Sequence, residues 1–291
     1  MANDSNDQAT GARRLWTLIE PIHAVTYFSD ASRDALAAAG FKGFWMGYFA
    51  ARSAPLGAAA TPAVVESTFF GFARSHVERS LPDAWTFATP EAALDARSRS
   101  AVIALRQAVP DLDEHVRRAL PLLESAAHAA RCDGRLLALS NQRLPQREDP
   151  VERLWQATTT LREHRGDGHV AALIAGGLGG IESLVLASKM AAGAADALHL
   201  RAARGWTESE WNAAIDRLVA QGLLDDDHRP TATGTLAHAR VEYATDEAAV
   251  QPFRDGLTES GLSLLSTVLR PIAAGARSIL PFPNPIGLPN Q

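Results

Sequence analysis

The chain has 291 residues, of which 46% are hydrophobic and 21% charged, and 28 basic against 33 acidic side chains give a net charge of −5 at pH 7. These values are typical of a soluble globular protein of about two domains, and they provide no overall attraction to nucleic acid. The single cysteine, Cys132, excludes an internal disulfide framework, and no apolar run approaches the roughly 18 residues of a membrane span. Because the first ten residues are polar and lack a basic segment, we expect no secretory signal and a cytoplasmic location.

Helical patterns dominate the first 142 residues. Apolar side chains spaced along residues 13–28 predict a helix, in which Pro21 is expected to cause a kink or a break. Ser29 predicts the cap of a second helix. Thr61 and Thr89 each precede a proline and therefore predict two further helix starts. The helices expected after the second one cover residues 44–53, 61–72, 89–108 and 111–131.

A polar stretch over residues 143–149 is the best candidate for a linker. It divides the chain into an N-terminal helical unit, residues 1–145, and a C-terminal unit, residues 146–291, which ends in a proline-rich tail. In the second unit a helix is expected over residues 151–164. Gly166 and Gly168 then interrupt the pattern and predict a corner between two helices.

Residues 205–243 predict a winged helix. Thr207 and Glu210 form a capping-box pattern ahead of an amphipathic helix that Gly222 ends. Two short strands on either side of a polar turn, residues 225–229, and a final helix complete the order helix, strand, turn, strand, helix. The helix over residues 207–221 carries one base and three acids, as does the wing over residues 223–230, so each has a net charge of −2. This charge disfavours DNA binding through Thr207–Gln221 and leaves a solvated acidic face or a surface for a partner protein as the alternatives.

The segment over residues 161–170 concentrates polar side chains between apolar stretches. At such a corner His164 or His169 can act as a general acid or base, and Glu163 or Asp167 can orient a histidine. Arg162 or Arg165 can hold a carboxylate. The alternative is a capped helix corner stabilised by ion pairs. The spacing matches no standard set of metal ligands, so we predict no metal.

Thirteen of the 19 aromatic residues precede residue 90, which favours an aromatic pocket in this part of the chain. Arg52 follows Tyr48 by four residues and shares its side of a helix, and an arginine among aromatic rings suits an anionic or aromatic ligand. His23 is either a core histidine, a pocket base or the axial ligand of a non-covalent haem. A core of large side chains is the alternative to a pocket. The proposed ligand-binding residues are His23, Tyr27, Trp45, Tyr48, Phe49, Arg52, Phe69 and Arg165.

Several stretches together resemble the actinobacterial SalK-like helix-turn-helix family: LWTLIEPIHAVTYFS at 15–29, GFWMGYFAARSAPLG at 43–57, SLPDAW at 80–85, LREHRGDGHVAAL at 161–173, GWTESEW at 205–211 and LPFPNPIGLP at 280–289. The stretch after residue 207 resembles the multiple-antibiotic-resistance regulator superfamily. These resemblances imply a mainly α fold of two diverged winged-helix units, fused in one chain as a pseudo-dimer with short β-wing strands.

The main functional hypothesis is a protein that binds an aromatic or apolar small molecule, with an enzymatic role at the 161–170 segment left open. The alternative is a ligand-responsive, DNA-binding transcriptional regulator. We expect no membrane partner, and either a monomer or a weak homo-oligomer.

Overall fold

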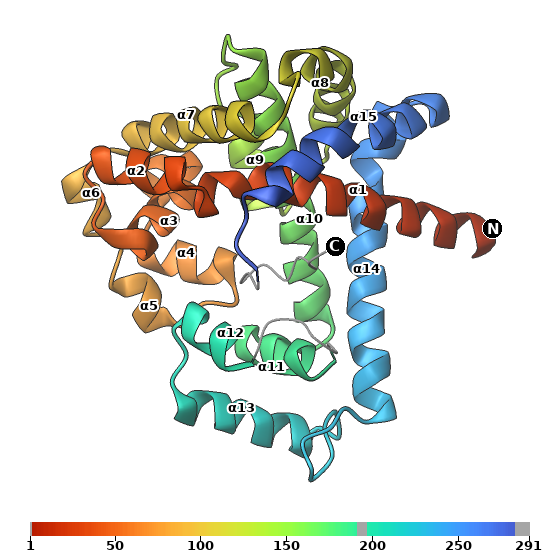
Figure 1. The fold of residues 1–291 in the computed structure, drawn as a ribbon. Coiled ribbons are helices and arrows are strands. Elements are labelled where there is room, and N and C mark those ends of the chain that lie inside the picture. Colours follow the sequence, from red (N-terminus) through yellow and green to blue (C-terminus); the bar gives the residue numbers. More distant parts are fainter. Residues whose placement is uncertain (1, 191–196, 283–291) are drawn as a thin grey trace.

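The computed structural model describes residues 2–190 and 197–282, with the side chains of residues 11–190 and 197–282, and this part of the chain is almost entirely helical (Figure 1). The helices are α1 (Ala2–Phe28), α2 (Asp30–Ala38), α3 (Gly43–Ser53), the 3-10 helix η1 (Ala54–Ala59), α4 (Pro62–Phe69), α5 (Arg74–Glu78), α6 (Ala84–Phe87), α7 (Pro90–Ala108), α8 (Leu112–Ala129), α9 (Leu136–Gln142), α10 (Pro150–Ala175), α11 (Gly180–Met190), α12 (Ala197–Arg204), α13 (Glu208–Ala220), α14 (Ala232–Gly256) and α15 (Glu259–Ser278).

Two long helices organise the molecule. α10 packs against α1, α7, α8, α9 and α14, and α1 packs against α14 and α15 (Figure 1). The large core lies among these helices, with Trp155 of α10, Ile22 of α1 and Leu105 of α7 almost fully buried. α10 and α14 extend beyond this body to the helices α11–α13.

The helices α11–α13, with the adjoining ends of α10 and α14, form a smaller lobe with a core of its own. We call it the helix-turn-helix lobe because a short turn joins its helices α12 and α13. Trp211 and Leu218 of α13 pack there with Val185 of α11 and Val241 of α14. The apolar face predicted for α13 is therefore the face that fills this second core.

The predicted helix caps are confirmed. The side chains of Ser29, Thr61 and Thr89 accept hydrogen bonds from backbone N–H groups in the first turns of α2, α4 and α7. Thr207 and Glu210 form the predicted capping box of α13. These caps satisfy N–H groups that have no partner within their own helix.

Two interruptions expected in the long helices are absent. α1 is one helix through Pro21, so of the expected kink or break the break is excluded, and α10 is one continuous helix through Gly166 and Gly168, with no corner between them. Each glycine costs a helix about 1 kcal/mol relative to alanine. The contacts of α10 with α8, α9 and α14 outweigh that cost, and a sequence pattern does not reveal them.

The predicted β-wing is also corrected. Over the described residues the wing has no strand, and only one isolated antiparallel bridge joins Leu224 and Pro230. Pro230 has no N–H to donate to a ladder. The Asp225 carboxylate instead accepts the N–H groups of Asp227 and Arg229 at 3.0 and 2.8 Å, which closes a compact turn. The wing position is therefore a short loop.

Among the described residues, no single helix is long and apolar enough to cross a membrane. The pair α10 and α11 has the length and composition of a membrane span, but its two helices are bent relative to each other by 97°. The division of the chain at residue 145 stays a prediction. Of the tail, Leu280 is buried against the large core, while residues 283–291 lie outside the described part of the chain.

Candidate functional site

A network of buried ion pairs links α1, α3 and α10. Glu163, whose side chain is 2% exposed, accepts two hydrogen bonds from Arg52 at 3.1 Å and one from Arg162 at 2.9 Å. Arg162 also pairs with Glu20 at 3.2 Å. Arg52 and Glu163 lie 111 residues apart in the chain, so α10 and α3 are held together by a two-pronged contact between a guanidinium and a carboxylate.

Glu163 stays ionised throughout the neutral range. Burial alone would raise its pKa, but Arg162 and Arg52 outweigh burial and hold the pKa of Glu163 well below its usual value. In turn Glu163 outweighs the desolvation of Arg52 and raises the pKa of that guanidinium. A carboxylate held in this state is suited to fixing positive charge and unsuited to exchanging a proton near pH 7.

Aromatic rings surround the Arg52 side of this network. The Arg52 guanidinium lies 4.1 Å from the centre of the Phe69 ring and donates to the Tyr48 hydroxyl at 3.3 Å, which confirms their predicted shared side of α3. The rings of Tyr48 and Tyr27 are 4.8 Å apart. Six of the predicted ligand-binding residues thus come together here: Tyr27, Trp45, Tyr48, Phe49, Arg52 and Phe69.

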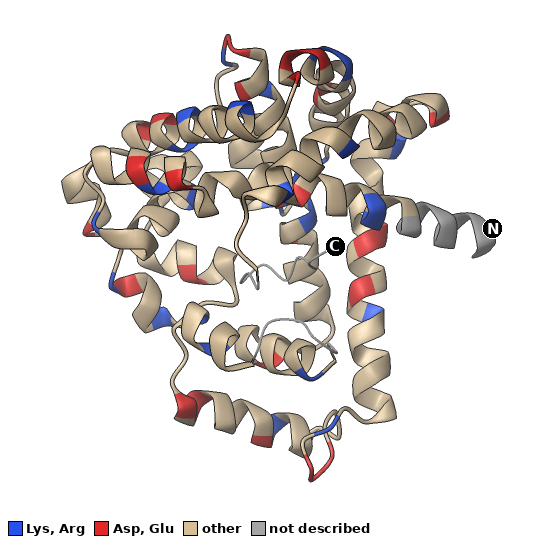
Figure 2. Ribbon diagram, in the orientation of Figure 1, with Lys and Arg blue, Asp and Glu red and all other residues tan. Residues whose placement is uncertain are grey.

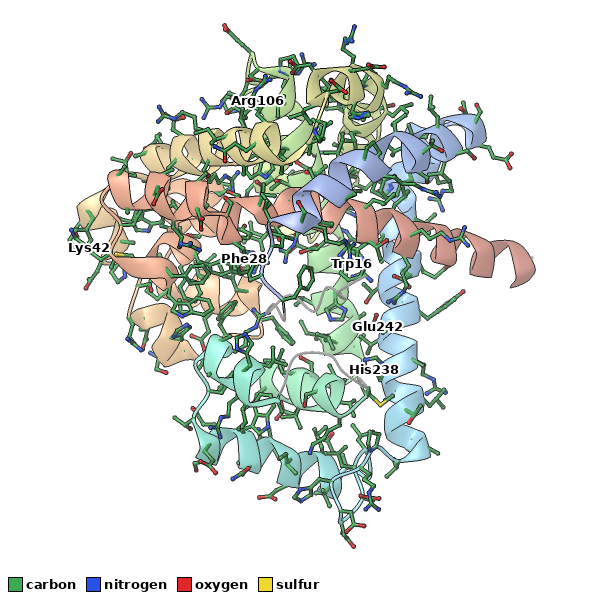
Figure 3. All side chains as sticks on the ribbon, in the orientation of Figure 1. Trp16, Phe28, Lys42, Arg106, His238 and Glu242 are labelled. Carbon is green, nitrogen blue, oxygen red and sulfur yellow. The ribbon has the colours of Figure 1, made fainter. Side chains whose placement is uncertain are left out.

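A pocket of about 250 Å³ opens beside these tyrosines, between α1, α2 and α3. The rings of Tyr27, Phe41, Phe44 and Tyr48 line it. Phe28, labelled in Figure 3, stacks on Phe44 with ring centres 6.1 Å apart. Its size and its aromatic walls suit a small aromatic or apolar molecule.

The contribution of α2 to this pocket was missed. Ser32 and Leu36 of α2 line it together with Gly47 of α3. A Cβ atom on Gly47 would lie 3.2 Å from a Leu36 methyl group, so the glycine permits the close approach of the two helices. The sequence signal was the small residue three positions after Phe44, on the same side of α3.

His23 lies next to this site as a core residue. It is 1% exposed, its Nδ1 is 3.0 Å from the Thr159 hydroxyl, and its ring contacts Tyr27 and Trp155 with centres 5.2 and 6.4 Å apart. Burial first, and then Arg162, lowers its pKa well below the usual value. These surroundings fit the packed histidine among the predicted alternatives and give no support to a haem ligand.

The polar side chains of the 161–170 segment do not converge. Because successive residues of a helix point about 100° apart, they contact different elements. The His164 Nε2 is 3.1 Å from the Arg131 backbone oxygen, whereas His169 pairs with Thr245 of α14 at 2.9 Å. Arg165 pairs with Asp246 and lies over the Trp16 ring, away from the other predicted ligand-binding residues.

The Asp167 side chain caps a neighbouring helix. Its carboxylate accepts the N–H of Ala138, in the first turn of α9, at 3.0 Å. Burial raises the pKa of Asp167 to about 6, while burial and Arg135 lower the pKa of His164 to about 4. A Cβ atom at Gly168 would displace the end of the Arg135 side chain, whose guanidinium donates to the His164 backbone oxygen.

Over the described residues, no group of three histidine, cysteine or acidic side chains is placed to hold a metal ion.

The helix-turn-helix lobe docks on the aromatic part of this site. The Trp206 indole donates to the Gly71 backbone oxygen at 3.0 Å, and the Ala73 N–H donates to the Arg204 backbone oxygen at 2.9 Å. The Arg204 guanidinium lies 4.4 Å from the centre of the Phe72 ring, and that ring is 5.6 Å from Tyr48. Contacts therefore run without interruption from the pocket wall to the start of α13.

The outer surface of the lobe is acidic at α13 and at the following turn (Figure 2). The two arginines of α13 and this turn are paired within the chain, Arg217 with Glu182 at 2.6 Å and Arg229 with Asp227 at 2.9 Å. Among the exposed acidic side chains, Asp216 lies on α13 and Asp226 lies in the turn. Such a surface repels phosphate groups.

Comparison with known proteins identifies the class. A family model described as a helix-turn-helix family matches residues 12–281, which is nearly the whole chain. The protein therefore belongs to this helix-turn-helix family. No curated protein and no solved structure matches the chain.

Proposed function

We propose that the protein is a ligand-responsive regulator-like protein. A small aromatic or apolar molecule binds in the pocket between α1, α2 and α3, and the helix-turn-helix lobe changes its binding to a target. The observation that carries this proposal is the position of Tyr48, which lines the pocket and contacts Phe72, the ring on which Arg204 of the lobe rests. Family membership supports the regulator-like part.

We further propose that the chain is a SalK-like pseudo-dimer of two diverged winged-helix units divided near residue 145. In support, α1 and α10 are long helices that contact each other, and each carries a leucine followed by a tryptophan, at 15–16 and 154–155. On this proposal the helix-turn-helix lobe belongs to the better preserved unit. On this proposal the chain acts as a monomer or a weak homo-oligomer.

Membership in a helix-turn-helix family favours DNA as the target of the lobe. The charges of α13 and the following turn oppose contact through Thr207–Gln221, so we propose that this helix does not enter the major groove as the main contact. We propose no reaction at the 161–170 segment, because its side chains contact separate elements.

The ligand part of the proposal is tested with indole as the probe. Ala37 is an exposed residue of α2 that lines the pocket, and Ala38 is an exposed neighbour that does not. Ala37→Trp should therefore block the pocket, whereas Ala38→Trp should leave it open. Isothermal titration should show indole binding to the wild type and to Ala38→Trp, with at least a ten-fold loss in Ala37→Trp. Equal affinity in the two variants would exclude this pocket.

The response is tested by hydrogen exchange and by DNA binding. Indole should slow amide exchange over residues 69–76 and 204–220 in the wild type but not in Ala37→Trp. Fluorescence polarisation with DNA from the protein's own promoter region should show binding that weakens steeply as salt rises and that changes when indole is added. If no DNA binds at low salt, the DNA-binding regulator is excluded.

A further inference from the structure

Arg97 is a cation in the large core with an incomplete set of partners. It is 1% exposed, and its guanidinium donates to the Ala51 backbone oxygen at 3.1 Å and to the side-chain oxygens of Asn141 and Gln156 at 2.9 and 3.4 Å. It also lies 5.3 Å from the Trp155 ring. Among the described residues, no carboxylate forms an ion pair with it.

The charge on Arg97 persists at neutral pH. Burial lowers its pKa to about 10, which leaves the guanidinium protonated. Buried charges in proteins are normally paired with an opposite charge, because neutral amide oxygens compensate only part of the lost hydration. Arg97 therefore leaves an excess of positive potential at Asn141 and Gln156.

These two amides line a second cavity. It has a volume of about 130 Å³ and lies between α8, α9, α10 and the 143–149 loop. On its wall Arg153 and Glu124 form a two-pronged ion pair with distances of 2.9 and 2.7 Å, and their charges cancel. Arg147 also lines the cavity, and it pairs with Asp95 at 2.7 Å and with Glu152 at 3.3 Å. These two acidic residues do not line the cavity. The lining of the cavity therefore holds no unpaired carboxylate that could balance the charge of Arg97 behind the amides.

We propose that this cavity binds a small oxyanion, a phosphate or a small carboxylate, which supplies the counter-charge that Arg97 lacks. Arg153 contacts the anion from the wall, and the Asn141 and Gln156 amides carry the field of Arg97 to it. The cavity volume admits one such anion with a few waters. This site is separate from the aromatic pocket, which is lined by other residues, and the proposal does not depend on the regulator-like function.

Inorganic phosphate is the probe, titrated at constant ionic strength against chloride, with the side-chain amide resonances of Asn141 and Gln156 followed by NMR. We expect saturable shifts in the wild type. Glu124→Gln removes the one carboxylate of the lining and should tighten phosphate binding by about five- to ten-fold, whereas Arg153→Gln should weaken it by a similar factor. Arg118→Gln, on the exposed face of α8, is the matched control and should bind as the wild type does.

A carboxylate source is distinguished from phosphate by repeating the titration with acetate. Saturation by either ion, with opposite effects of Glu124→Gln and Arg153→Gln, supports the site. Shifts that do not saturate, or that are the same in all three variants, would show that Arg97 is only a structural cation and would overturn the proposal.

Discussion

Replacement of Glu163 by glutamine is the most direct test of the network that joins α3 to α10. Glu163 is 1% exposed and accepts three hydrogen bonds from two guanidinium groups. In Glu163→Gln the shape is kept, but Arg52 and Arg162 lose their shared negative charge, and the new amide N–H groups face other donors. Breaking a buried ion pair by removing one partner costs about 3–5 kcal/mol. We therefore expect the free energy of unfolding to fall by that amount at pH 7.

Urea denaturation followed by circular dichroism measures this loss. Glu114→Gln, an exposed change on α8, is the control and should alter the free energy of unfolding by less than about 0.5 kcal/mol. A loss below about 1 kcal/mol in Glu163→Gln, with an unchanged dependence on urea, would refute the reasoning that this carboxylate holds the two helices together.

The same pair of proteins has a defined pH dependence. The pKa of Glu163 in the folded state lies below the value of about 4.3 that a glutamate has in an unfolded chain. Its stabilising contribution is therefore complete above about pH 4.3 and is lost as the pH falls through the folded-state pKa. The difference in the free energy of unfolding between wild type and Glu163→Gln should shrink below pH 4. A difference that stays constant down to pH 3 would contradict the lowered pKa of Glu163.

Three further changes test other parts of the structure. Burial raises the pKa of Asp167 to about 6, so its ionised form is disfavoured in the folded state. Asp167→Asn should therefore stabilise the protein by about 1–2 kcal/mol at pH 8 but by less at pH 5, and equal gains in denaturation experiments at the two pH values would contradict the raised pKa. Thr207→Ala removes the capping box of α13 and should cost about 1 kcal/mol and speed amide exchange in the first turn, whereas unchanged exchange would show that the box is not needed. Gly205 and Gly222 both have a positive φ, 77° and 69°, but only Gly205 packs on the His76 ring. Thermal denaturation should therefore show a larger loss of stability for Gly205→Ala than for Gly222→Ala, and equal losses would argue against this contact.

The parts of the fold that depend on neighbouring residues were predictable. Thr61 and Thr89 cap their helices because a threonine followed by a proline satisfies N–H groups within four residues, without help from the rest of the chain. The capping box at Thr207 is equally local. The same reasoning failed at Gly166 and Gly168, where the packing of α10 against three other helices decides the backbone.

The candidate site shows the same limit. The contact between Tyr48 and Arg52 follows from their spacing on one helix. Arg52 and Glu163 lie 111 residues apart in the chain, so their ion pair could not be predicted from spacing. The residues next to Glu163 in the sequence suggested instead that it orients a catalytic histidine. A cluster of polar letters in a sequence gives no direction for its side chains until the helix that carries them has been placed.

The acidic surface of the helix-turn-helix lobe decides how any DNA contact must be made. Arg217 pairs with Glu182, and Arg229 pairs with Asp227. Both arginine side chains are exposed, so a phosphate can compete for either of them. That competition would leave their carboxylate partners, Glu182 and Asp227, without a cation, and Asp216 would remain on the same helix. Each phosphate gained on this face therefore exposes a new negative charge. If α13 nevertheless faces DNA, Asp216→Asn must strengthen DNA binding measured by fluorescence polarisation, and if the contact lies elsewhere, the affinity must stay the same.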